Sequence, residues 1–188
     1  MEKLNICVDI DGTITEPFFK IEGIDNKPIK FHVEHNCQSN ELDKMSREDF
    51  MDYYEKYGEE MHKNAIIREH SDTYLQRLSR EHNVFFVTAR PPRMEKVTER
   101  WFKSHGIPKN HIFFLGSHDK LSKAQELDCD IFIEDRYENA LQLSEAGIFV
   151  LLIDCEYNRD TLNDQIKRVE TWDKVYEEIE KYKKVVVE

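Results

Sequence analysis

Two aspartates lie two residues apart near the start of the chain and are its strongest chemical signal. An apolar run at 4–8 is followed directly by Asp9-Ile10-Asp11-Gly12-Thr13. Side chains two apart point the same way while a strand lasts, and a glycine lets the backbone turn sharply after them. One carboxylate of such a pair can attack an electrophile while the other moves a proton. Many aspartate pairs belong only to turns, but this position directly after a strand favours a catalytic site.

Three later apolar runs are also followed by polar residues. The runs at 84–87, 111–115 and 130–133 precede, in this order, Thr88-Ala89-Arg90, Lys120 and Glu134-Asp135. In open α/β sheets, ligands bind beyond the carboxyl ends of the strands, so these residues are expected to gather with the first aspartate pair.

Such a gathering would crowd four carboxylates into one crevice: Asp9, Asp11, Glu134 and Asp135. Like charges raise one another's pKa unless a cation compensates. Oxygen ligands suit Mg²⁺, and Lys120 can supply further positive charge. The sequence therefore predicts a magnesium site with a lysine beside it.

The elements that must position these residues alternate along the chain. Five short apolar runs, at 4–8, 84–87, 111–115, 130–133 and 148–153, have the length and composition of strands covered on both faces. Helical spacing separates the last four, and another amphipathic helix is expected in the tail around Trp172 to Ile179. We expect an α/β fold with a doubly wound, Rossmann-like and mostly parallel five-stranded sheet.

The segment between the first two runs has a different pattern. A capping box at 46–49 precedes helical spacing of aromatic residues that Gly58 is expected to end, and further helices are expected at 59–69 and 72–81. We expect residues 18–67 to form a mainly helical cap inserted after the first strand. The core would then consist of residues 1–17 and 68–188.

Composition excludes several other classes of protein. The 38 acidic residues exceed the 27 basic ones and give a formal charge of −11, which disfavours binding to a nucleic-acid polymer. No signal peptide is recognisable and no segment has the roughly 20 apolar residues that span a bilayer, so a cytoplasmic location is expected. The four cysteines are scattered and are expected to be reduced and mostly buried. A homodimer remains open.

The four polar segments, in this order, resemble the signatures of the haloacid dehalogenase superfamily of phosphatases. The Asp9 to Thr13 segment is similar to the first signature, and a strand ending in Thr88 is similar to the second. Lys120 corresponds to the third, and Glu134-Asp135 to the fourth, in which glutamate stands for the first of two aspartates. These matches cover nearly all of the core.

The resemblance implies a role for each residue. Asp9 would attack phosphorus and form an aspartyl-phosphate, and Asp11 would protonate the leaving alcohol and later activate water. Asp9, Asp135 and the backbone carbonyl of Asp11 would hold Mg²⁺, with Glu134 reaching the metal through water or only holding its neighbours. Thr88 would bind a phosphate oxygen, and Lys120 would neutralise shared negative charge.

The mainly helical cap after the first signature corresponds to the C1 position of this superfamily. Together with Thr88-Ala89-Arg90 and Glu134-Asp135-Arg136, it most resembles the 5′(3′)-deoxyribonucleotidase-like nucleotidases. The implied substrate is a nucleoside monophosphate or its deoxy form. The residues expected to contact it are Thr88, Ala89, Arg90, Lys120, Phe18 and Phe19.

Alternatives to parts of this interpretation stay open. Phe18 and Phe19 could stack on a base or pack the cap against the core, and Arg90 could hold the substrate or be exposed. Each of the eight histidines is expected at the surface or in packing. The substrate could instead be a sugar phosphate or a similar metabolite. A non-catalytic phosphate-binding or signalling module is the alternative from another class.

Overall fold

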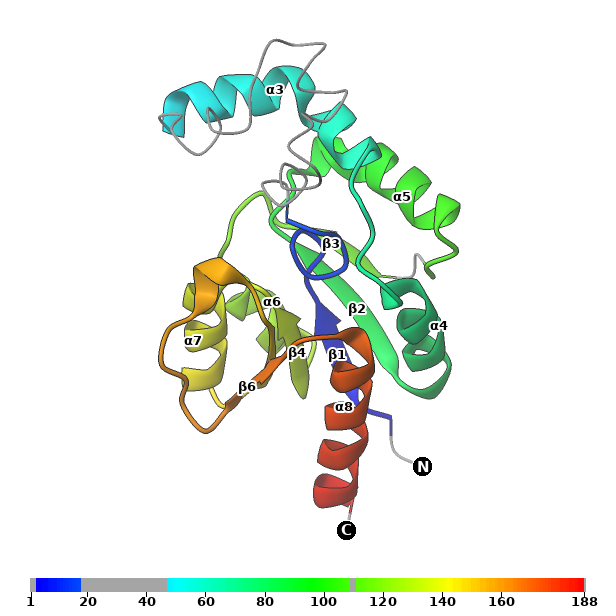
Figure 1. The fold of residues 1–188 in the computed structure, drawn as a ribbon, viewed down its shortest axis with the longest axis vertical. Coiled ribbons are helices and arrows are strands. Elements are labelled where there is room, and N and C mark those ends of the chain that lie inside the picture. Colours follow the sequence, from blue (N-terminus) through cyan, green and yellow to red (C-terminus); the bar gives the residue numbers. More distant parts are fainter. Residues whose placement is uncertain (1–2, 18–46, 109–110, 188) are drawn as a thin grey trace.

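The computed structural model describes residues 3–17, 47–108 and 111–187, and its centre is one parallel sheet (Figure 1). The strand order is β3-β2-β1-β4-β5-β6, and every pairing is parallel. The strands are β1 (Asn5–Val8), β2 (Asn83–Thr88), β3 (Ile112–Phe114), β4 (Ile131–Glu134), β5 (Phe149–Ile153) and β6 (Ile166–Val169). The expected α/β fold with a doubly wound sheet is confirmed.

Helices cover both faces of the sheet and divide the core into two apolar layers. Alternate strand residues face opposite sides, so Ile6 and Val8 belong to one layer and Cys7 to the other. The first layer is closed by α4 (Ser71–Glu81), α5 (Glu95–Ser104) and α8 (Trp172–Val187), and the second by α6 (Leu121–Glu126) and α7 (Tyr137–Glu145). Burial on both faces explains why the central strands are continuously apolar.

The sheet has six strands, so the expected count of five is wrong. The additional strand β6 pairs with β5 at the edge of the sheet. Only its first and last residues, Ile166 and Val169, are buried, and the two residues between them are basic. An edge strand of this kind has no continuous apolar run, which is why the hydrophobic pattern did not reveal it.

Helix α3 (Arg47–Lys63) is continuous, so the expected break at Gly58 and the helix at 59–69 are wrong. Gly58 serves close packing instead of ending the helix. A Cβ atom there would lie 2.7 Å from Met94 Cε and 3.2 Å from a ring carbon of Tyr54. Met94 ends the short helix η2 (Pro92–Met94), so the absence of a side chain lets α3 approach this segment.

The two ends of the segment expected as a cap meet at the core. Thr15 and Ile67 form an antiparallel bridge. The backbone N–H of Glu16 donates to Ile66 O at 2.8 Å, and that of Arg68 donates to Ile14 O at the same distance. The part of the segment that the structure describes is mainly α3, which contacts α5 and lies beyond the carboxyl ends of the strands (Figure 1).

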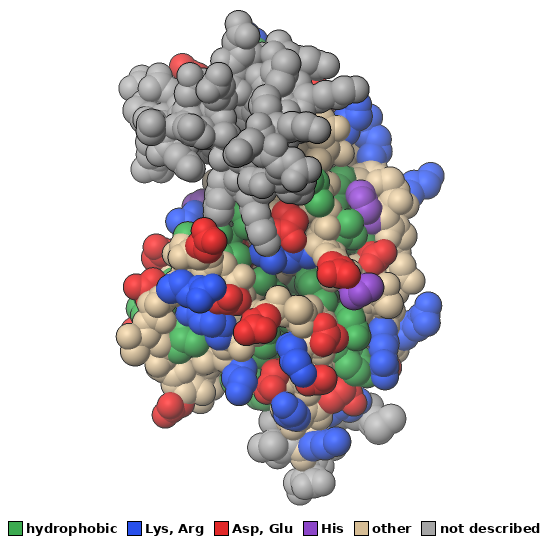
Figure 2. All heavy atoms as spheres, in the orientation of Figure 1, with side chains coloured by type: hydrophobic (Ala, Val, Ile, Leu, Met, Phe, Trp, Pro, Cys, Tyr) green, Lys and Arg blue, Asp and Glu red, His purple; other side chains and the backbone are tan. Residues whose placement is uncertain are grey.

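Charges of both signs are interspersed over the core on the face that Figure 2 shows, without a large area of one sign. None of the described helices is both long and apolar enough to cross a lipid bilayer. Among the described cysteines, Cys7 and Cys155 are buried and Cys129 is partly buried, and all three are free thiols. Cys37 lies outside the described residues.

Candidate active site

A buried lysine joins two of the predicted carboxylates at the carboxyl edge of the sheet. Lys120 Nζ lies 2.6 Å from Asp9 Oδ1 and 2.7 Å from Glu134 Oε2. Asp9 follows β1, Glu134 ends β4, and Lys120 immediately precedes α6. The Asp9 N–H donates to Ile133 O at 3.0 Å, which holds the ends of the two central strands together. All three side chains are almost fully buried.

Asp135 completes a cluster of carboxylates with an excess of negative charge. One side-chain oxygen from each of Asp9, Glu134 and Asp135 lies within 4.8 Å of the others. Among the residues that the structure describes, Lys120 is the cation that contacts this cluster directly, so three buried carboxylates face one described ammonium group. Burying carboxylates without compensation is costly, and a divalent cation would offset the excess.

The pKa values of the clustered side chains are displaced by the same imbalance of charge. Burial raises the pKa of Asp9 to about 7, with Lys120 opposing and Glu134 and Asp11 adding to the rise. Burial and the charges of Glu134 and Asp9 raise the pKa of Asp135 well above its ordinary value. Burial acts against the charged form of Lys120, but Asp9 and Glu134 outweigh it and raise the lysine pKa. Lys120 is therefore charged, but its single positive charge does not balance the three carboxylates of the cluster.

The oxygens of Glu134 are already engaged by the protein. Oε2 accepts a hydrogen bond from Lys120 Nζ, and Oε1 accepts from the backbone N–H groups of Asp135 at 3.2 Å and Arg136 at 3.0 Å. These contacts hold the lysine and the chain after β4 in place.

The loop after Asp9 approaches Asp135 so closely that a side chain would not fit. Gly12 has φ +82°, and a Cβ atom there would lie 2.1 Å from Asp135 Oδ2. The carbonyl of Gly12 accepts from Arg68 Nε at 2.9 Å, and Thr13 Oγ1 donates to Asp135 Oδ1 at 3.3 Å. Gly12 therefore meets two requirements, a left-handed backbone and space for a carboxylate.

Replacing Gly12 by alanine is expected to lower the free energy of unfolding by roughly 2–4 kcal/mol, because backbone strain and a clash with Asp135 add. Gly147→Ala is the matched control, since Gly147 has φ +87° but no atom within 4 Å of its Cβ position. That variant isolates the backbone cost, about 1 kcal/mol. Urea unfolding measures both, and equal losses would contradict the proposed clash.

A short segment after β5 holds Asp135 from the other side. Helix η3 (Glu156–Asn158) places the Tyr157 hydroxyl where it donates to Asp135 Oδ2. Asn158 Nδ2 donates to the Asp135 backbone carbonyl at 2.6 Å. Neither residue could be predicted as part of the site, because nothing in the sequence pattern around them marks one.

Asp11 points to a different set of partners. Arg90 donates from Nε to Asp11 Oδ2 at 2.8 Å and from Nη2 to Oδ1 at 2.6 Å. His62, at the end of α3, has its Nδ1 atom 3.6 Å from Asp11 Oδ1. Burial opposes ionisation of Asp11, but Arg90 and His62 outweigh it and hold the pKa of Asp11 well below its ordinary range.

The other predicted substrate-binding residues are only partly placed. Thr88 is fully buried at the end of β2, beside β1, and its Oγ1 accepts from the Arg90 N–H at 3.1 Å. Ala89 is partly buried in the bend that follows. Phe18 and Phe19 lie outside the described residues.

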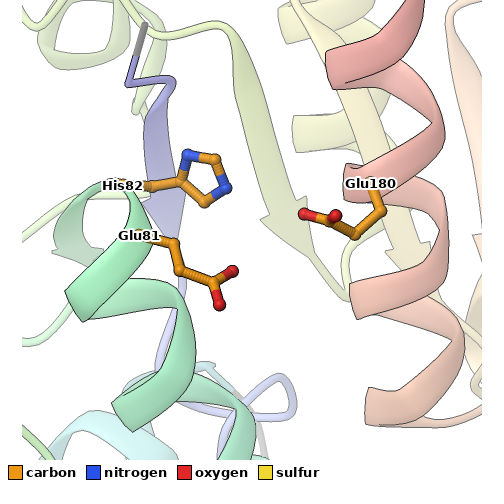
Figure 3. Close-up of side chains that lie close together, drawn as sticks. All are labelled: Glu81, His82 and Glu180. Carbon is orange, nitrogen blue, oxygen red and sulfur yellow. The ribbon is translucent and has the colours of Figure 1, made fainter. Parts of the chain in front are cut away.

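Of the residues that the structure describes, two groups bring three potential metal ligands together: the acid cluster above and a second group formed by Glu81, His82 and Glu180. Figure 3 shows the second group between the end of α4 and helix α8. The Leu4 N–H donates to His82 Nδ1 at 3.3 Å, so a neutral ring carries its proton on Nε2. Because a metal ligand needs a lone pair on that nitrogen, the acid cluster is the better metal site.

Known proteins identify the family to which this chain belongs. The family described as 5′ nucleotidase, deoxy (Pyrimidine), cytosolic type C protein matches residues 3–185. A nucleotidase of Clostridium acetobutylicum is 41% identical over 180 residues, which are 94% of this chain and 93% of that protein.

Solved structures show the same fold. A haloacid dehalogenase-like hydrolase of Streptococcus pneumoniae has a TM-score of 0.63 at 17% identity, covering 94% of this chain and 98% of its own. YfnB of Bacillus subtilis, described as a HAD-hydrolase bound to magnesium, has a TM-score of 0.63 at 11% identity and coverages of 96% and 100%. The chain is a phosphoric monoester hydrolase and belongs to the cytosolic type C 5′-nucleotidase family of the haloacid dehalogenase superfamily.

Proposed function

We propose that this nucleotidase works through an aspartyl-phosphate on Asp9 and requires Mg²⁺. The observation that carries the proposal is the contact of Asp9 with Lys120 inside a buried cluster of three carboxylates. An exposed aspartate would repel a phosphate dianion. A lysine and a divalent cation reduce that repulsion and stabilise the charge that develops on the transferred group.

The side chains of Asp9 and Asp135 and the backbone carbonyl of Asp11 would hold the metal, because hard oxygen ligands suit Mg²⁺. When bound, the ion would supply positive charge beside the phosphoryl oxygens. Glu134 would act on Lys120, since both of its oxygens already accept hydrogen bonds from the protein. Thr88, at the end of the neighbouring strand, would donate its hydroxyl to a phosphate oxygen.

The reaction would proceed in two displacements at phosphorus. An Asp9 oxygen forms a bond to phosphorus as the bond to the ester oxygen breaks. Asp11, which Arg90 and His62 hold ionised in this structure, would first take up a proton and then donate it to the departing alcohol. Asp11 then takes a proton from water, whose oxygen attacks phosphorus and releases Asp9 and inorganic phosphate. Asp11 returns to its protonated form, so the cycle consumes one water and yields an alcohol and phosphate.

The substrate would be a nucleoside monophosphate, most directly a deoxynucleotide, acted on in the cytoplasm. The description of the matching family names a cytosolic enzyme for deoxy pyrimidine compounds, and the Clostridium relative is named a nucleotidase. A sugar phosphate is the alternative within the same chemistry.

A panel of phosphate monoesters, assayed with Mg²⁺ and again with excess chelator, tests the proposal. Nucleoside monophosphates are expected to be hydrolysed faster than sugar phosphates, and chelator is expected to abolish both reactions. A nucleoside cyclic phosphodiester is the control, because it offers no terminal phosphoryl group. Full activity in chelator would refute the metal requirement, and a consistent preference for sugar phosphates would refute the nucleotide assignment.

A further inference from the structure

We infer that His62 is a positioning residue for Asp11, supplied to the active site by helix α3. The inference rests on the proposed acid and base role of Asp11. It also changes the interpretation of two residues, because His62 was expected only at the surface or in packing and Arg90 was a candidate substrate ligand. The geometry places these two side chains on the Asp11 carboxylate.

Arg90 contacts the Asp11 carboxylate from the core of the protein. Its side chain is 2% exposed, and two of its nitrogens hold both oxygens of Asp11 in a planar, two-bond contact. The third nitrogen, Nη1, donates to Thr98 Oγ1 at 2.9 Å, and that hydroxyl donates to Met94 O at 2.8 Å. Each guanidinium nitrogen therefore has an acceptor in the protein, and the fork is fixed relative to α5.

His62 supplies the contact from α3. It is 1% exposed, and its Nε2 lies 2.6 Å from the hydroxyl of Tyr54, about two helical turns earlier. The ionised Asp11 carboxylate faces Nδ1, with Oδ1 at 3.6 Å, and this favours the tautomer that carries the ring proton on Nδ1. Burial raises the pKa of Tyr54, so its hydroxyl keeps its proton and can donate to Nε2 of that tautomer. Tyr54 thus supports the tautomer that places a donor toward the carboxylate.

The two sides together limit how the Asp11 carboxylate can turn. Arg90 alone fixes the plane of the carboxylate, and His62 approaches the oxygen that Arg90 Nη2 also contacts. Because α3 contacts α5 and η2, both sides rest on one packed set of helices. Proton transfer to a leaving group depends on the direction of the donor as well as on distance. Loss of His62 also removes a contact that lowers the pKa of Asp11, so a selective loss in the acid step shows that direction outweighs the easier protonation.

The test compares two variants of similar shape at position 62. His62→Asn keeps an N–H donor near the place of Nδ1, and His62→Leu does not. Their kcat/KM values are measured with an alkyl phosphate, whose alkoxide needs a proton as it leaves, and with 4-nitrophenyl phosphate, whose leaving group needs little help. This constant reports steps up to phosphoenzyme formation, the step in which Asp11 acts as an acid.

His62→Leu is expected to lower kcat/KM for the alkyl phosphate about tenfold more than for the aryl phosphate. His62→Asn is expected to stay within about threefold of the original ratio. Tyr54→Phe is a milder change and should shift the ratio of the two kcat/KM values in the same direction as His62→Leu. It replaces His62→Leu in the test if that variant folds poorly. Equal losses for both substrates would show that His62 has only a structural role and would overturn the inference.

Two further variants separate this inference from the proposed function. His82→Leu is the matched control, since His82 is also 2% exposed but lies beside Leu4 at the start of β1, and its substrate ratio should not change. Asp11→Asn gives the largest shift expected of any variant. If Asp11→Asn leaves the ratio of the two substrates unchanged, the acid role of Asp11 is wrong. If Asp11→Asn shifts the ratio and His62→Leu does not, only the positioning role of His62 is overturned.

Discussion

Asp9→Asn is expected to lower turnover by roughly 10⁴-fold or more, the scale seen when a catalytic nucleophile is removed. An amide oxygen is a poor nucleophile toward phosphorus and cannot form the aspartyl-phosphate. The fold should survive, because asparagine has nearly the same shape and can still accept a hydrogen bond from Lys120. Turnover of a nucleoside monophosphate and trapping of acid-stable phosphoprotein during turnover measure the two effects.

Asp128→Asn is the control for this change. Asp128 is exposed and has φ +46°, a conformation that asparagine tolerates, and it lies before β4, at the opposite edge of the sheet from Asp9. This variant should retain full turnover and phosphoprotein formation. Normal turnover in Asp9→Asn would eliminate Asp9 as the nucleophile.

Lys120→Met is expected to reduce the free energy of unfolding by about 3–5 kcal/mol, the cost of leaving a buried charge without its partner. Methionine fills much of the same volume, so packing is largely preserved. What is lost is the ammonium group between Asp9 and Glu134, both of which stay buried. Urea unfolding in the presence of chelator measures the loss without interference from bound metal.

Lys123→Met is the matched control, because Lys123 lies on the adjoining helix α6 and pairs with Glu126 at the surface. Ion pairs of this kind contribute less than about 1 kcal/mol. The comparison separates the loss of a buried charge from the loss of a lysine in general. A similar small loss in both variants would contradict the account of Lys120 as the compensating cation.

Much of the site could be predicted from sequence because the residues follow strands of a parallel sheet. Once the runs before Asp9 and Glu134 are recognised as strands, their carboxyl ends must meet at one edge, and the structure places the two acids there with Lys120 between them. Asp135 and Thr88 follow from the same rule. The positions of these strands along the chain and their burial could therefore be predicted from the apolar pattern.

Other features depend on tertiary contacts that no local pattern encodes. Glycine is common at the ends of helices, but Gly58 lies inside α3, where the lack of a side chain lets the helix pack against Met94. His62 and Asp11 are 51 positions apart and meet only because α3 returns to the core. From its place in the sequence Arg90 was a candidate phosphate ligand, but in the structure its guanidinium group donates to Asp11 and Thr98. Edge strand β6 is too polar to be recognised before its partner β5 is placed.

The bridge between Thr15 and Ile67 also bears on how this architecture can vary. The points where the chain leaves the core and returns to it lie side by side, as two paired strands do. The core therefore keeps the same structure at this point whatever the length of chain between them. Closing a longer excursion costs little, since each doubling of its length adds only about 0.6 kcal/mol. The chain between Glu16 and Ile66 can therefore become longer or shorter at little cost to the stability of the core.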